Sequence, residues 1–482
     1  MRNITELLNK IAGSNYDLGN NIKGISYDSR RTKEGDIFIA LTGNNYDGNS
    51  YIEEAIESGA IAVITSERIE DKKLQVPIIN VDNTRKFMSK ISSEINDCPS
   101  KNINMIGIIG TNGKSTIAKI IEHILNDNNI SAGSLGTLGF SSPSGVISTG
   151  FTTPESVELH SMLKMLVEAK TKFCIMEVSS HSLDMHRVDD VNYNTVIFSN
   201  LTQDHLDYHS SMDRYFHTKQ KLFKMVDKDS LAVINCDDYY GKKIIKSCSA
   251  NIIKYGFDKE ANIRILDANY NLFGTTAEIQ IDSSKYKIRT NLIGEFNLYN
   301  IAASIASLIG ILDIDTIVKS LINIQDIPGR MNTIFTNNKK IIIDYAHTPD
   351  AFNNIINTTR SIMDDIGKII VVFGCGGNRD SYKRKEIGSI VDTLSDYSII
   401  TDDNPRNEDP DNIINEILLG YDTKNYKIIR NRQDGIIAGI NKLNNNDILL
   451  VLGKGNEDYQ EVNNTRVYHS DFDTVNNYIY EI

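Results

Sequence analysis

The stretch that decides the fold is Ile103-Asn-Met-Ile-Gly-Ile-Ile-Gly110-Thr-Asn-Gly113-Lys114-Ser115-Thr116. Its first part, Ile103 to Ile109, is an apolar run of strand length, and Ser115 to Asn126 has the apolar spacing of a helix. A strand, a glycine-rich turn and a helix in this order form a nucleotide-binding unit. We therefore predict an α/β domain with a mostly parallel sheet around this segment.

The glycine-rich turn has the chemistry of a phosphate-binding loop. Glycines let backbone N–H groups approach phosphate oxygens closely, and the amino end of the following helix carries a partial positive charge. Lys114 adds a point charge and Ser115 can hold Mg²⁺, although Ile108 stands where the common P-loop has its first glycine. The alternative is a glycine-rich turn with an incidental lysine. The residues expected to hold a nucleoside triphosphate are Gly110, Thr111, Asn112, Gly113, Lys114, Ser115 and Thr116.

Length, charge and cysteine content limit the class of protein. The chain has 482 residues, which predicts about three domains. Its 51 basic and 63 acidic residues give a net charge of −12, which argues against bulk binding of nucleic acid or anionic membranes. No apolar run approaches the ~18 residues of a membrane span, Met1 to Ala12 lacks the apolar core of a signal peptide, and the five cysteines form no CxxC pair. We expect a cytoplasmic protein without membrane insertion, disulfide framework or zinc site.

Three regions of the chain differ in content. Residues 1–100 contain short strand-like runs and end in a polar stretch that is typical of a linker. Residues 101–331 hold the phosphate loop and further strand-like runs separated by helical patterns. Residues 332–482 alternate again. We expect three α/β domains with these boundaries. In the third region, strands are predicted at Ile341 to Tyr345, Ile369 to Gly374, Ser398 to Thr401 and Ile448 to Gly453.

Two acidic segments follow strand-like runs in the middle region. Glu177 lies at the end of an apolar strand, where parallel sheets place catalytic groups. Asn200 to His209 is a dense cluster of acid and imidazole side chains just past another strand. Hard oxygen ligands with one imidazole suit Mg²⁺ or Mn²⁺. Each segment alone could be a hydrogen-bonded loop, but beside a phosphate loop both are candidate metal sites.

From end to end, the chain resembles the Mur ligases, the ATP-dependent amide-bond-forming enzymes of peptidoglycan precursor synthesis. The match is closest to the branch that adds the third amino acid. The motifs that carry the resemblance are Asp28-Ser-Arg30, Gly35-Asp-Ile-Phe38, Gly110 to Lys114, Thr152-Thr-Pro-Glu155, Glu177-Val-Ser-Ser-His181, Asn200-Leu-Thr-Gln-Asp-His205, Gly294-Glu-Phe-Asn297, Pro328-Gly-Arg-Met331, Asp344-Tyr-Ala-His347-Thr-Pro-Asp-Ala, Gly374-Cys-Gly-Gly377, Asp403-Asn-Pro-Arg406 and Gly453-Lys-Gly455.

The resemblance implies a UDP-binding N-terminal domain, a central P-loop ATPase domain and a Rossmann-like C-terminal domain. It implies an ADP-forming carbon–nitrogen ligase that adds meso-diaminopimelate to UDP-N-acetylmuramoyl-L-alanyl-D-glutamate. The acceptor carboxylate would form an acyl phosphate with ATP, and the amine would then displace phosphate. The implied partners are ATP, the UDP-N-acetylmuramoyl-dipeptide and meso-diaminopimelate, with Mg²⁺ as cofactor, and we expect a monomer.

By similarity, catalysis and ATP binding use residues of the central and C-terminal regions. Lys114 would hold the phosphates, and Ser115 and Glu177 would hold one Mg²⁺. His205 would ligate a second Mg²⁺ together with Lys219, whose counterpart in relatives is carbamylated. Taken alone, Lys219 would be a solvated helix lysine. Three further residues would contact ATP, namely Asn297, Arg330 near the phosphates and Asp344 at the ribose.

The UDP-sugar peptide would lie on the N-terminal and central domains. Arg187 is a sensible partner for an anionic acceptor, because a guanidinium grips a carboxylate through two hydrogen bonds, although a surface ion pair is the alternative. The residues that match uridine contacts are Ser29, Asn44, Asn45 and Tyr46, and those that match contacts around the peptide are Thr152, Thr153, Ser179 and Arg187.

The third region carries the signal for the added amino acid. Diaminopimelate has a second carboxylate that lysine lacks, and Arg406 could pair with it through two hydrogen bonds. Relatives that add L-lysine usually lack this arginine, although the segment could also be a turn before a helix. The expected contacts are Arg384, Asp403, Asn404, Pro405, Arg406, Gly453 and Glu457, whereas Asn378, Lys385 and Asn456 depart from the family pattern.

Other functions fit parts of the same pattern. The scaffold could serve L-lysine or another amino acid. Folylpolyglutamate synthase shares the ATP-site motifs, but would not be expected to carry the uridine-binding domain that Ser29 suggests. A degenerate ligase that acts only as a binding scaffold would not need Lys114, Glu177 and Lys219.

Overall fold

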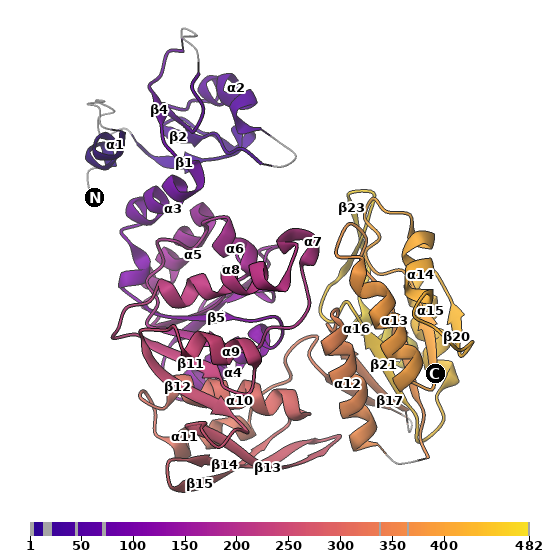
Figure 1. Ribbon diagram of the computed structural model, residues 1–482. Helices are drawn as coiled ribbons and strands as arrows, with labels where there is room; N and C mark the ends of the chain where they lie inside the picture. The colour runs from indigo at the N-terminus through magenta and orange to yellow at the C-terminus, as the bar shows by residue number, and fades with distance from the viewer. Residues whose placement is uncertain are drawn as a thin grey trace. The chain divides into compact units, whose positions relative to one another are not determined.

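The structure is a computed structural model that describes residues 4–12, 22–43, 47–69, 74–336, 339–363 and 366–480 (Figure 1). The chain divides into two compact units. The first comprises residues 1–107, 130–196 and 221–230, and the second comprises residues 108–129, 197–220 and 231–482. In the described ranges, every helix is too short or too polar to cross a membrane.

The N-terminal region forms a four-stranded parallel sheet between helices. Because successive side chains of a strand point to opposite faces, Ile37 and Ile39 pack with Phe87 and Ile91 of α3 on one face, whereas Phe38 packs in a cluster with α2 on the other. The elements are α1 (Ile4–Ala12), β1 (Gly24–Ser26), η1 (Ser29–Arg31), β2 (Asp36–Ile39), η2 (Gly48–Tyr51), α2 (Ile52–Glu57), β3 (Ala62–Thr65), β4 (Ile78–Asn80) and α3 (Thr84–Ile95), with strand order β1-β2-β3-β4.

The central sheet has eleven strands in the order β15-β14-β13-β12-β11-β10-β5-β9-β6-β7-β8. The pairs β6–β9, β11–β12 and β12–β13 are parallel, whereas the pairs β6–β7, β7–β8, β13–β14 and β14–β15 are antiparallel. Its strands are β5 (Asn104–Ile109), β6 (Ala132–Gly136), β7 (Gly139–Ser142), β8 (Gly145–Ile147), β9 (Phe173–Glu177), β10 (Thr195–Phe198), β11 (Leu231–Asn235), β12 (Asn251–Gly256), β13 (Ile263–Asn271), β14 (Gly274–Ile281) and β15 (Ser284–Thr290).

The helices of the central region connect these strands. The phosphate loop leads from β5 into α4, as the sequence predicts, and α4 begins at Lys114. The helices are η3 (Pro99–Lys101), α4 (Lys114–Asp127), α5 (Ser156–Glu168), α6 (Ser180–Asp184), α7 (Leu206–His209), α8 (Met212–Lys224), α9 (Tyr239–Ile245), α10 (Glu295–Leu308) and α11 (Ile314–Ile322).

The C-terminal region has a six-stranded sheet in the order β16-β17-β21-β18-β19-β20, in which only β16 is antiparallel to its neighbour. Its strands are β16 (Asn332–Thr336), β17 (Lys339–Asp344), β18 (Ile369–Phe373), β19 (Tyr397–Ile400), β20 (Tyr426–Ile428) and β21 (Ile448–Leu452), followed by the hairpin of β22 (Tyr459–Val462) and β23 (Thr465–Tyr468). Its helices are α12 (Pro349–Ile362), α13 (Tyr382–Leu394), α14 (Pro410–Leu418), α15 (Arg432–Lys442) and α16 (Asp471–Tyr480).

Helices cover both faces of this C-terminal sheet (Figure 1). Val371 and Leu450 pack with residues of α12, α13 and α14, whereas Ile370 and Leu449 pack with residues of α15 and α16. A parallel strand buried on both faces is apolar at every position, which explains the continuous apolar runs. The predicted α/β fold is therefore confirmed, and the four strands predicted here agree with β17, β18, β19 and β21 within two residues.

The centre of this sheet should carry much of the stability of the C-terminal region. Leu450 is fully buried, so Leu450→Ala should lower the free energy of unfolding by about 2–5 kcal/mol, through lost burial and the cavity it leaves. Chemical denaturation measures the change. Val467→Ala on β23, where 56% of the side chain is exposed, is the control and should change it by less than about 0.5 kcal/mol. Equal losses in both variants would contradict this picture of the core.

Candidate active site

The phosphate loop is a tight turn between β5 and α4 that only glycine can form. Gly113 has φ +89°, and a Cβ atom there would lie 2.4 Å from Oδ1 of Asn300. A Cβ atom on Gly110 would lie 1.9 Å from Oγ of Ser199. The Lys114 ammonium donates hydrogen bonds to the carbonyls of Gly110 and Thr111 at 3.0 and 2.9 Å, so its charge lies within the turn.

A second loop, Asn200 to Thr202, fixes the phosphate loop from the end of β10. The backbone N–H of Thr111 donates to the Asn200 carbonyl at 2.9 Å, and that of Asn112 donates to Oδ1 of Asn200 at the same distance. The Thr111 hydroxyl donates to the Thr202 carbonyl at 3.1 Å. The first residues of the Asn200 to His205 motif therefore hold the phosphate loop in place through hydrogen bonds.

Lys219 on α8 is buried against the same turn, with 2% of its surface exposed. Its Nζ atom donates to the Gly110 carbonyl at 2.7 Å and lies 4.5 Å from the centre of the Tyr215 ring. Burial, followed by the charge of Lys114, holds the pKa of Lys219 well below its usual value. A lysine with a depressed pKa has a larger fraction of neutral amine, which is the form that can react with carbon dioxide to give a carbamate.

The loop that follows Thr202 places His205 and Asp204 together. His205 has a left-handed backbone, with φ +54°. Asp204 is buried, and its carboxylate lies 3.3 Å from Nζ of Lys383, 3.3 Å from Nε2 of His205 and 3.8 Å from Nε2 of His347. Burial alone would raise the pKa of Asp204, but these neighbouring groups hold it well below its usual value. The sequence analysis did not predict this cluster of side chains around the Asp204 carboxylate.

A cavity of about 380 Å³ adjoins the phosphate loop. Arg330 reaches across it, since Nη2 donates to the Ser115 hydroxyl at 3.1 Å and the guanidinium lies 4.9 Å from the Tyr345 ring centre. Its size and polar walls suit part of a nucleotide. Six of the predicted ATP-binding residues line this cavity, namely Asn112, Gly113, Thr116, Asn297, Arg330 and Asp344.

Asp344 ends β17 and is fixed in the wall of this cavity. Its Oδ2 atom accepts a hydrogen bond from the Met331 backbone at 2.8 Å. Burial raises the pKa of Asp344 to about 6, although Arg330 opposes the shift. The carboxyl group therefore changes charge near pH 6, because no strong ion pair within the described ranges holds it ionised.

Glu177 lies in the other compact unit, at the end of β9, with 2% of its surface exposed. Its Oε1 atom accepts from the Thr137 backbone at 2.9 Å, and Oε2 accepts from the Thr137 hydroxyl at 3.3 Å. A Cβ atom on Gly136 would lie 2.2 Å from Oε1, so this glycine makes room for the carboxylate. Few oxygen lone pairs are used, and the rest can accept from water or a metal.

The residues predicted around the peptide acceptor gather beside Glu177 in that unit. The Thr153 hydroxyl donates to the Glu177 carbonyl at 2.8 Å, and the Ser179 backbone donates to the same hydroxyl oxygen at 3.1 Å. Thr152 shares a hydrogen bond of 3.0 Å with the Thr137 hydroxyl. Thr152, Thr153 and Ser179 therefore form one continuous hydrogen-bonded wall at the carboxyl end of β9.

Arg187 is hydrogen-bonded to this wall and also forms an ion pair. Its Nη1 atom donates to the Thr153 carbonyl at 2.9 Å, and Nη2 forms an ion pair of 2.7 Å with Glu155. Ser29 is buried at the start of η1. Three predicted uridine contacts, Asn44, Asn45 and Tyr46, lie outside the described residues.

In the C-terminal region, the two predicted arginines are both engaged by carboxylates. Arg384 is fully buried and donates to Glu408 at 2.6 and 2.7 Å and to Glu416 at 2.9 Å. Arg406 has φ +54° and donates to Glu461 through Nε at 3.1 Å. By contrast, Arg379 is exposed and makes no hydrogen bond or ion pair with any residue in the described ranges.

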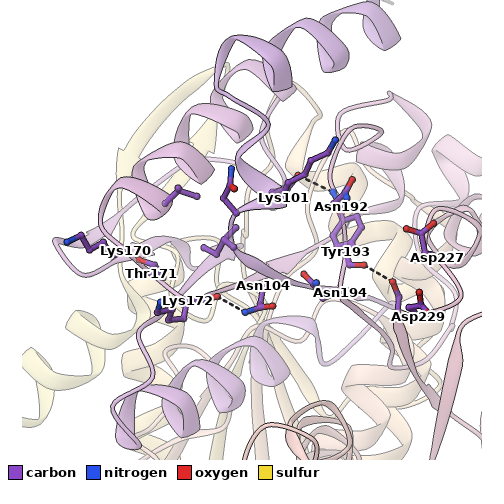
Figure 2. A pocket seen from close by; sticks show the side chains of 15 residues that line it. Lys101, Asn104, Lys170, Thr171, Lys172, Asn192, Tyr193, Asn194, Asp227 and Asp229 are labelled. Carbon is purple, nitrogen blue, oxygen red and sulfur yellow. Dashed lines mark hydrogen bonds between the residues drawn. The ribbon is translucent and has the colours of Figure 1, made fainter. Parts of the chain in front are cut away.

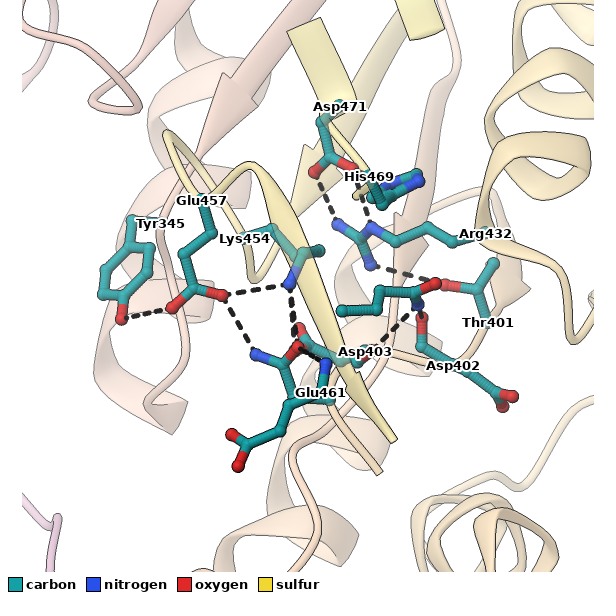
Figure 3. Close-up of polar contacts among 12 residues, drawn as sticks. Tyr345, Thr401, Asp402, Asp403, Arg432, Lys454, Glu457, Glu461, His469 and Asp471 are labelled. Carbon is teal, nitrogen blue, oxygen red and sulfur yellow. Dashed lines mark hydrogen bonds and ion pairs between the residues drawn. The ribbon is translucent and has the colours of Figure 1, made fainter. Parts of the chain in front are cut away.

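Lys454 connects the two loops that carry the remaining amino-acid contacts. Its fully buried ammonium donates to Oδ1 of Asn404 at 3.0 Å and to Glu457 at 2.9 Å (Figure 3). Asn404 also donates to Glu457 at 3.0 Å. Gly453 has φ +117°, and a Cβ atom there would lie 2.6 Å from Asp403. The Pro405 carbonyl accepts from Glu408 and so closes the first loop.

A second and larger cavity, of about 960 Å³, lies at the amino ends of β5, β9 and β10 (Figure 2). Lys101, Lys170 and Lys172 border it, and all three are exposed. None of the predicted site residues lines it. Since α/β sheets place their catalytic groups at the carboxyl ends of strands, this hollow is not the candidate active site.

Comparisons with known proteins identify the family. Residues 21–95 match the model described as Mur ligase family, catalytic domain, residues 108–308 match the Mur ligase middle domain, and residues 329–455 match the Mur ligase, glutamate ligase domain. The chain belongs to the Mur ligase family. The resemblance noted in the sequence is thereby confirmed.

Similar Mur ligases cover almost the whole chain. A UDP-N-acetylmuramoyl-L-alanyl-D-glutamate--2,6-diaminopimelate ligase of Aquifex aeolicus is 40% identical over 94% of this chain and 93% of its own. A ligase of the same name from Clostridium botulinum is 38% identical over 96% of each chain.

Solved structures support the Mur ligase fold. One of a ligase with the same name superposes with a TM-score of 0.67 at 30% identity, over 95% of this chain and 94% of that one. Mycobacterium tuberculosis folylpolyglutamate synthase complexed with ADP has a TM-score of 0.65 at 17% identity, over 77% of this chain and 91% of that one, and so shows the fold alone.

Sequence reasoning did not single out three residues that lie beside the predicted site residues of this Mur ligase. Lys454 lies within the Gly453-Lys-Gly455 motif, and this position could have marked it as a candidate site residue. Asp204 lies within the quoted Asn200 to His205 motif, but nothing local announces its pairing with Lys383. Arg379 precedes Arg384 by only five positions, and only the fold distinguishes the exposed guanidinium from the buried one.

Asp344 gives the Mur ligase a testable pH dependence. Because its pKa rises from 3.8 to about 6 on folding, the folded state binds more protons than the unfolded state between these values. Stability should therefore fall as pH rises from about 4 to 6. Asp344→Asn should remove this component and raise the melting temperature at pH 7, as measured by calorimetry across this range. An unchanged pH profile in the variant would contradict the assignment.

Proposed function

We propose that this chain is the ATP-dependent ligase that adds meso-diaminopimelate to UDP-N-acetylmuramoyl-L-alanyl-D-glutamate, with formation of ADP and phosphate. The observation that carries the proposal is the phosphate loop with Lys114 inside its turn, opening onto a cavity that six predicted ATP-binding residues line. The names of relatives at 38–40% identity support the choice of substrates.

The chemistry proceeds in two balanced steps. A carboxylate oxygen of the dipeptide attacks the γ-phosphorus of ATP, the bond to the β–γ bridging oxygen breaks, and an acyl phosphate and ADP form. The amine nitrogen of the third substrate then attacks the acyl carbon, and inorganic phosphate leaves as the amide forms and a proton is lost. Lys114 and Arg330 offset the repulsion between the anionic reactants, and the enzyme holds them in line.

One Mg²⁺ would be held by Ser115 and Glu177, and a second by His205 and a carbamylated Lys219. Hard oxygen donors with one imidazole fit this ion, and Glu177 keeps lone pairs for it. Among the described residues, no three His, Cys, Asp or Glu side chains form a ready-made metal cage. That fits Mg²⁺, which typically binds through one or two carboxylates, water and substrate phosphates. When bound, the ion neutralises charge on the transferring phosphoryl group.

The acceptor would lie on the residues of the first unit. Thr152, Thr153 and Ser179 form a polar wall at the end of β9. Arg187 adds a positive charge that Glu155 only partly neutralises, because this carboxylate also pairs with Arg85. The uridine would contact Ser29 and the segment Asn44-Asn45-Tyr46.

For the third substrate, we place the two carboxylate contacts on Arg406 and Arg379. The resemblance assigns one carboxylate to Arg384, but its guanidinium already faces Glu408 and Glu416 inside the fold. Glu408 accepts from the backbone of Asn378 at 2.9 Å, so Arg384 holds the loop that presents Arg379. Asp403, Asn404, Pro405, Gly453 and Glu457 would complete the pocket.

Three further properties of the chain are proposals of the same kind. We propose domains at residues 1–100, 101–331 and 332–482, an enzyme that acts as a monomer, and a cytoplasmic location. The five cysteines are all free thiols, which fits a reducing compartment.

A panel of amino acids tests the proposal. Purified protein with ATP, Mg²⁺ and UDP-N-acetylmuramoyl-L-alanyl-D-glutamate should release ADP fastest with meso-diaminopimelate. Faster release with L-lysine would favour the alternative substrate and contradict the argument from Arg406. No release with any amine, although ATP and Mg²⁺ are present, would refute the ligase activity itself.

Lys114→Ala should abolish turnover while the protein still folds, because the lost charge lies within the phosphate loop. ADP release measures turnover, and the melting temperature measures folding. Lys119→Ala, on the next turn of the same helix, is the matched control and should remain active. An active Lys114→Ala enzyme would overturn the phosphate-loop assignment.

The two arginines of the Arg379–Arg384 segment should behave differently. Arg379→Met should raise KM for meso-diaminopimelate about tenfold or more with little change in melting temperature, because this side chain is exposed. Arg384→Met should lower the melting temperature, because it leaves Glu408 and Glu416 without their partner. The reverse pattern, with only Arg384→Met affecting KM at full stability, would return the substrate contact to Arg384.

A further inference from the structure

A buried ionic cluster lies behind the two loops of the amino-acid pocket. Arg432, at the start of α15, and Asp471, at the start of α16, are joined by two hydrogen bonds of 2.8 and 2.7 Å, and both side chains are fully buried (Figure 3). His469 contacts the same carboxylate at 2.9 Å. The mechanism above uses none of these groups.

The guanidinium of Arg432 also reaches two strand ends. Nη2 donates to the Leu452 carbonyl at 3.0 Å, at the end of β21. Nη1 donates to the Thr401 hydroxyl at 3.4 Å, just past the end of β19 (Figure 3). In the sheet, β18 separates these two strands, so no backbone ladder joins them. Arg432 therefore forms a direct link between the starts of two loops that the sheet alone does not connect.

These two loops carry the proposed contacts to the third substrate. Asp403 to Arg406 follows Thr401, and Gly453 to Glu457 follows Leu452. Lys454 joins the loops near the pocket, through Asn404 and Glu457, and Arg432 joins them at their base. The two loops are thus joined by one cation near the pocket, Lys454, and by another at their base, Arg432.

We propose that Arg432, fixed by Asp471, is a positioning residue for the amino-acid substrate, which sets the distance between the loop of Asn404 and Arg406 and the loop of Gly453 and Glu457. This inference rests on the proposed function. Arg432 touches no substrate, and acts through the two strand ends that it joins.

The chemistry of the cluster favours a geometric role. Burying two charges costs free energy that their attraction repays only in part, so a buried pair adds little net stability. A planar guanidinium can face one carboxylate with two nitrogens and still point a donor at a carbonyl and a hydroxyl, whereas an ammonium cannot reproduce this fork. Burial would raise the pKa of Asp471, but Arg432 and His469 hold it well below its usual value, so the fixing anion stays charged.

Arg432→Lys tests the proposal because it keeps the charge and changes the geometry. The ammonium can still pair with Asp471, so the protein should fold. The links to Leu452 and Thr401 should weaken, and KM for meso-diaminopimelate should rise about tenfold, because small displacements in a binding site are costly. KM for ATP and for the UDP-dipeptide should stay within about twofold of wild type. Steady-state ADP release with each substrate varied in turn provides these values.

A second variant keeps the proposal testable if Arg432→Lys does not fold. The double variant Arg432→Met with Asp471→Leu removes both charges together, which buried pairs commonly tolerate, and it should show the same selective rise in KM. Asp447→Asn is the control. Asp447 is buried at the opposite, amino end of β21, where it accepts from the Lys368 and Asn444 backbones at 2.8 and 2.9 Å. It should lower stability without affecting KM for the amino acid.

The outcomes separate this inference from the proposed function. If wild-type enzyme turns over no amino acid, the proposed function fails. If wild type is active and the variants bind meso-diaminopimelate with wild-type KM, the positioning role of Arg432 is refuted. An equal rise in KM for all three substrates would also refute it, because a general loss of structure would then explain the effect.

Discussion

Close approach of side chains to the backbone at Gly110 and Gly113 is the constraint on which the rest of the active site depends. There is no space for a Cβ atom at either position, because Ser199 and Asn300 occupy it. This contact brings the end of β5 against the loop after β10, and the carbonyls of the turn then receive both Lys114 and Lys219. Two lysine side chains are thus concentrated on one turn, and burial together with the charge of Lys114 favours the neutral form of the Lys219 amine.

Buried charge is handled differently in the C-terminal region. There, each buried cation has a carboxylate within reach: Arg384 has Glu408, Arg432 has Asp471, and Lys454 has Glu457. Arg379 is left as an exposed guanidinium, and a Cβ atom on Gly376 would contact both Nη1 of Arg406 and Cγ of Arg379. In the described part of this region, positive charge is therefore compensated where the loops are anchored, whereas the Arg379 guanidinium is exposed.

The sequence predicted what depends on local chemistry. The phosphate loop was predictable because its strand, glycines, lysine and helix are adjacent in the chain, and the apolar runs of the C-terminal sheet follow from burial on both faces. The different surroundings of Arg379 and Arg384 were not predictable in this way. The partners of Arg384 lie 24 and 32 positions away, and only the fold shows which of the two arginines they neutralise. The antiparallel strands β13 to β15 were also missed, although β13 alternates buried and exposed residues as such strands do.

The last helix has a consequence for the integrity of the chain. Asp471 opens α16, and it is the anion that compensates a guanidinium at the beginning of α15. Proteolytic cleavage in the hairpin between Leu452 and Asp471, followed by loss of the released peptide, would therefore strand a permanent cation in an apolar interior. The carboxyl-terminal helix therefore supplies the charge that compensates Arg432. The protein should not tolerate its removal, even though α16 contributes no group to the nucleotide cavity.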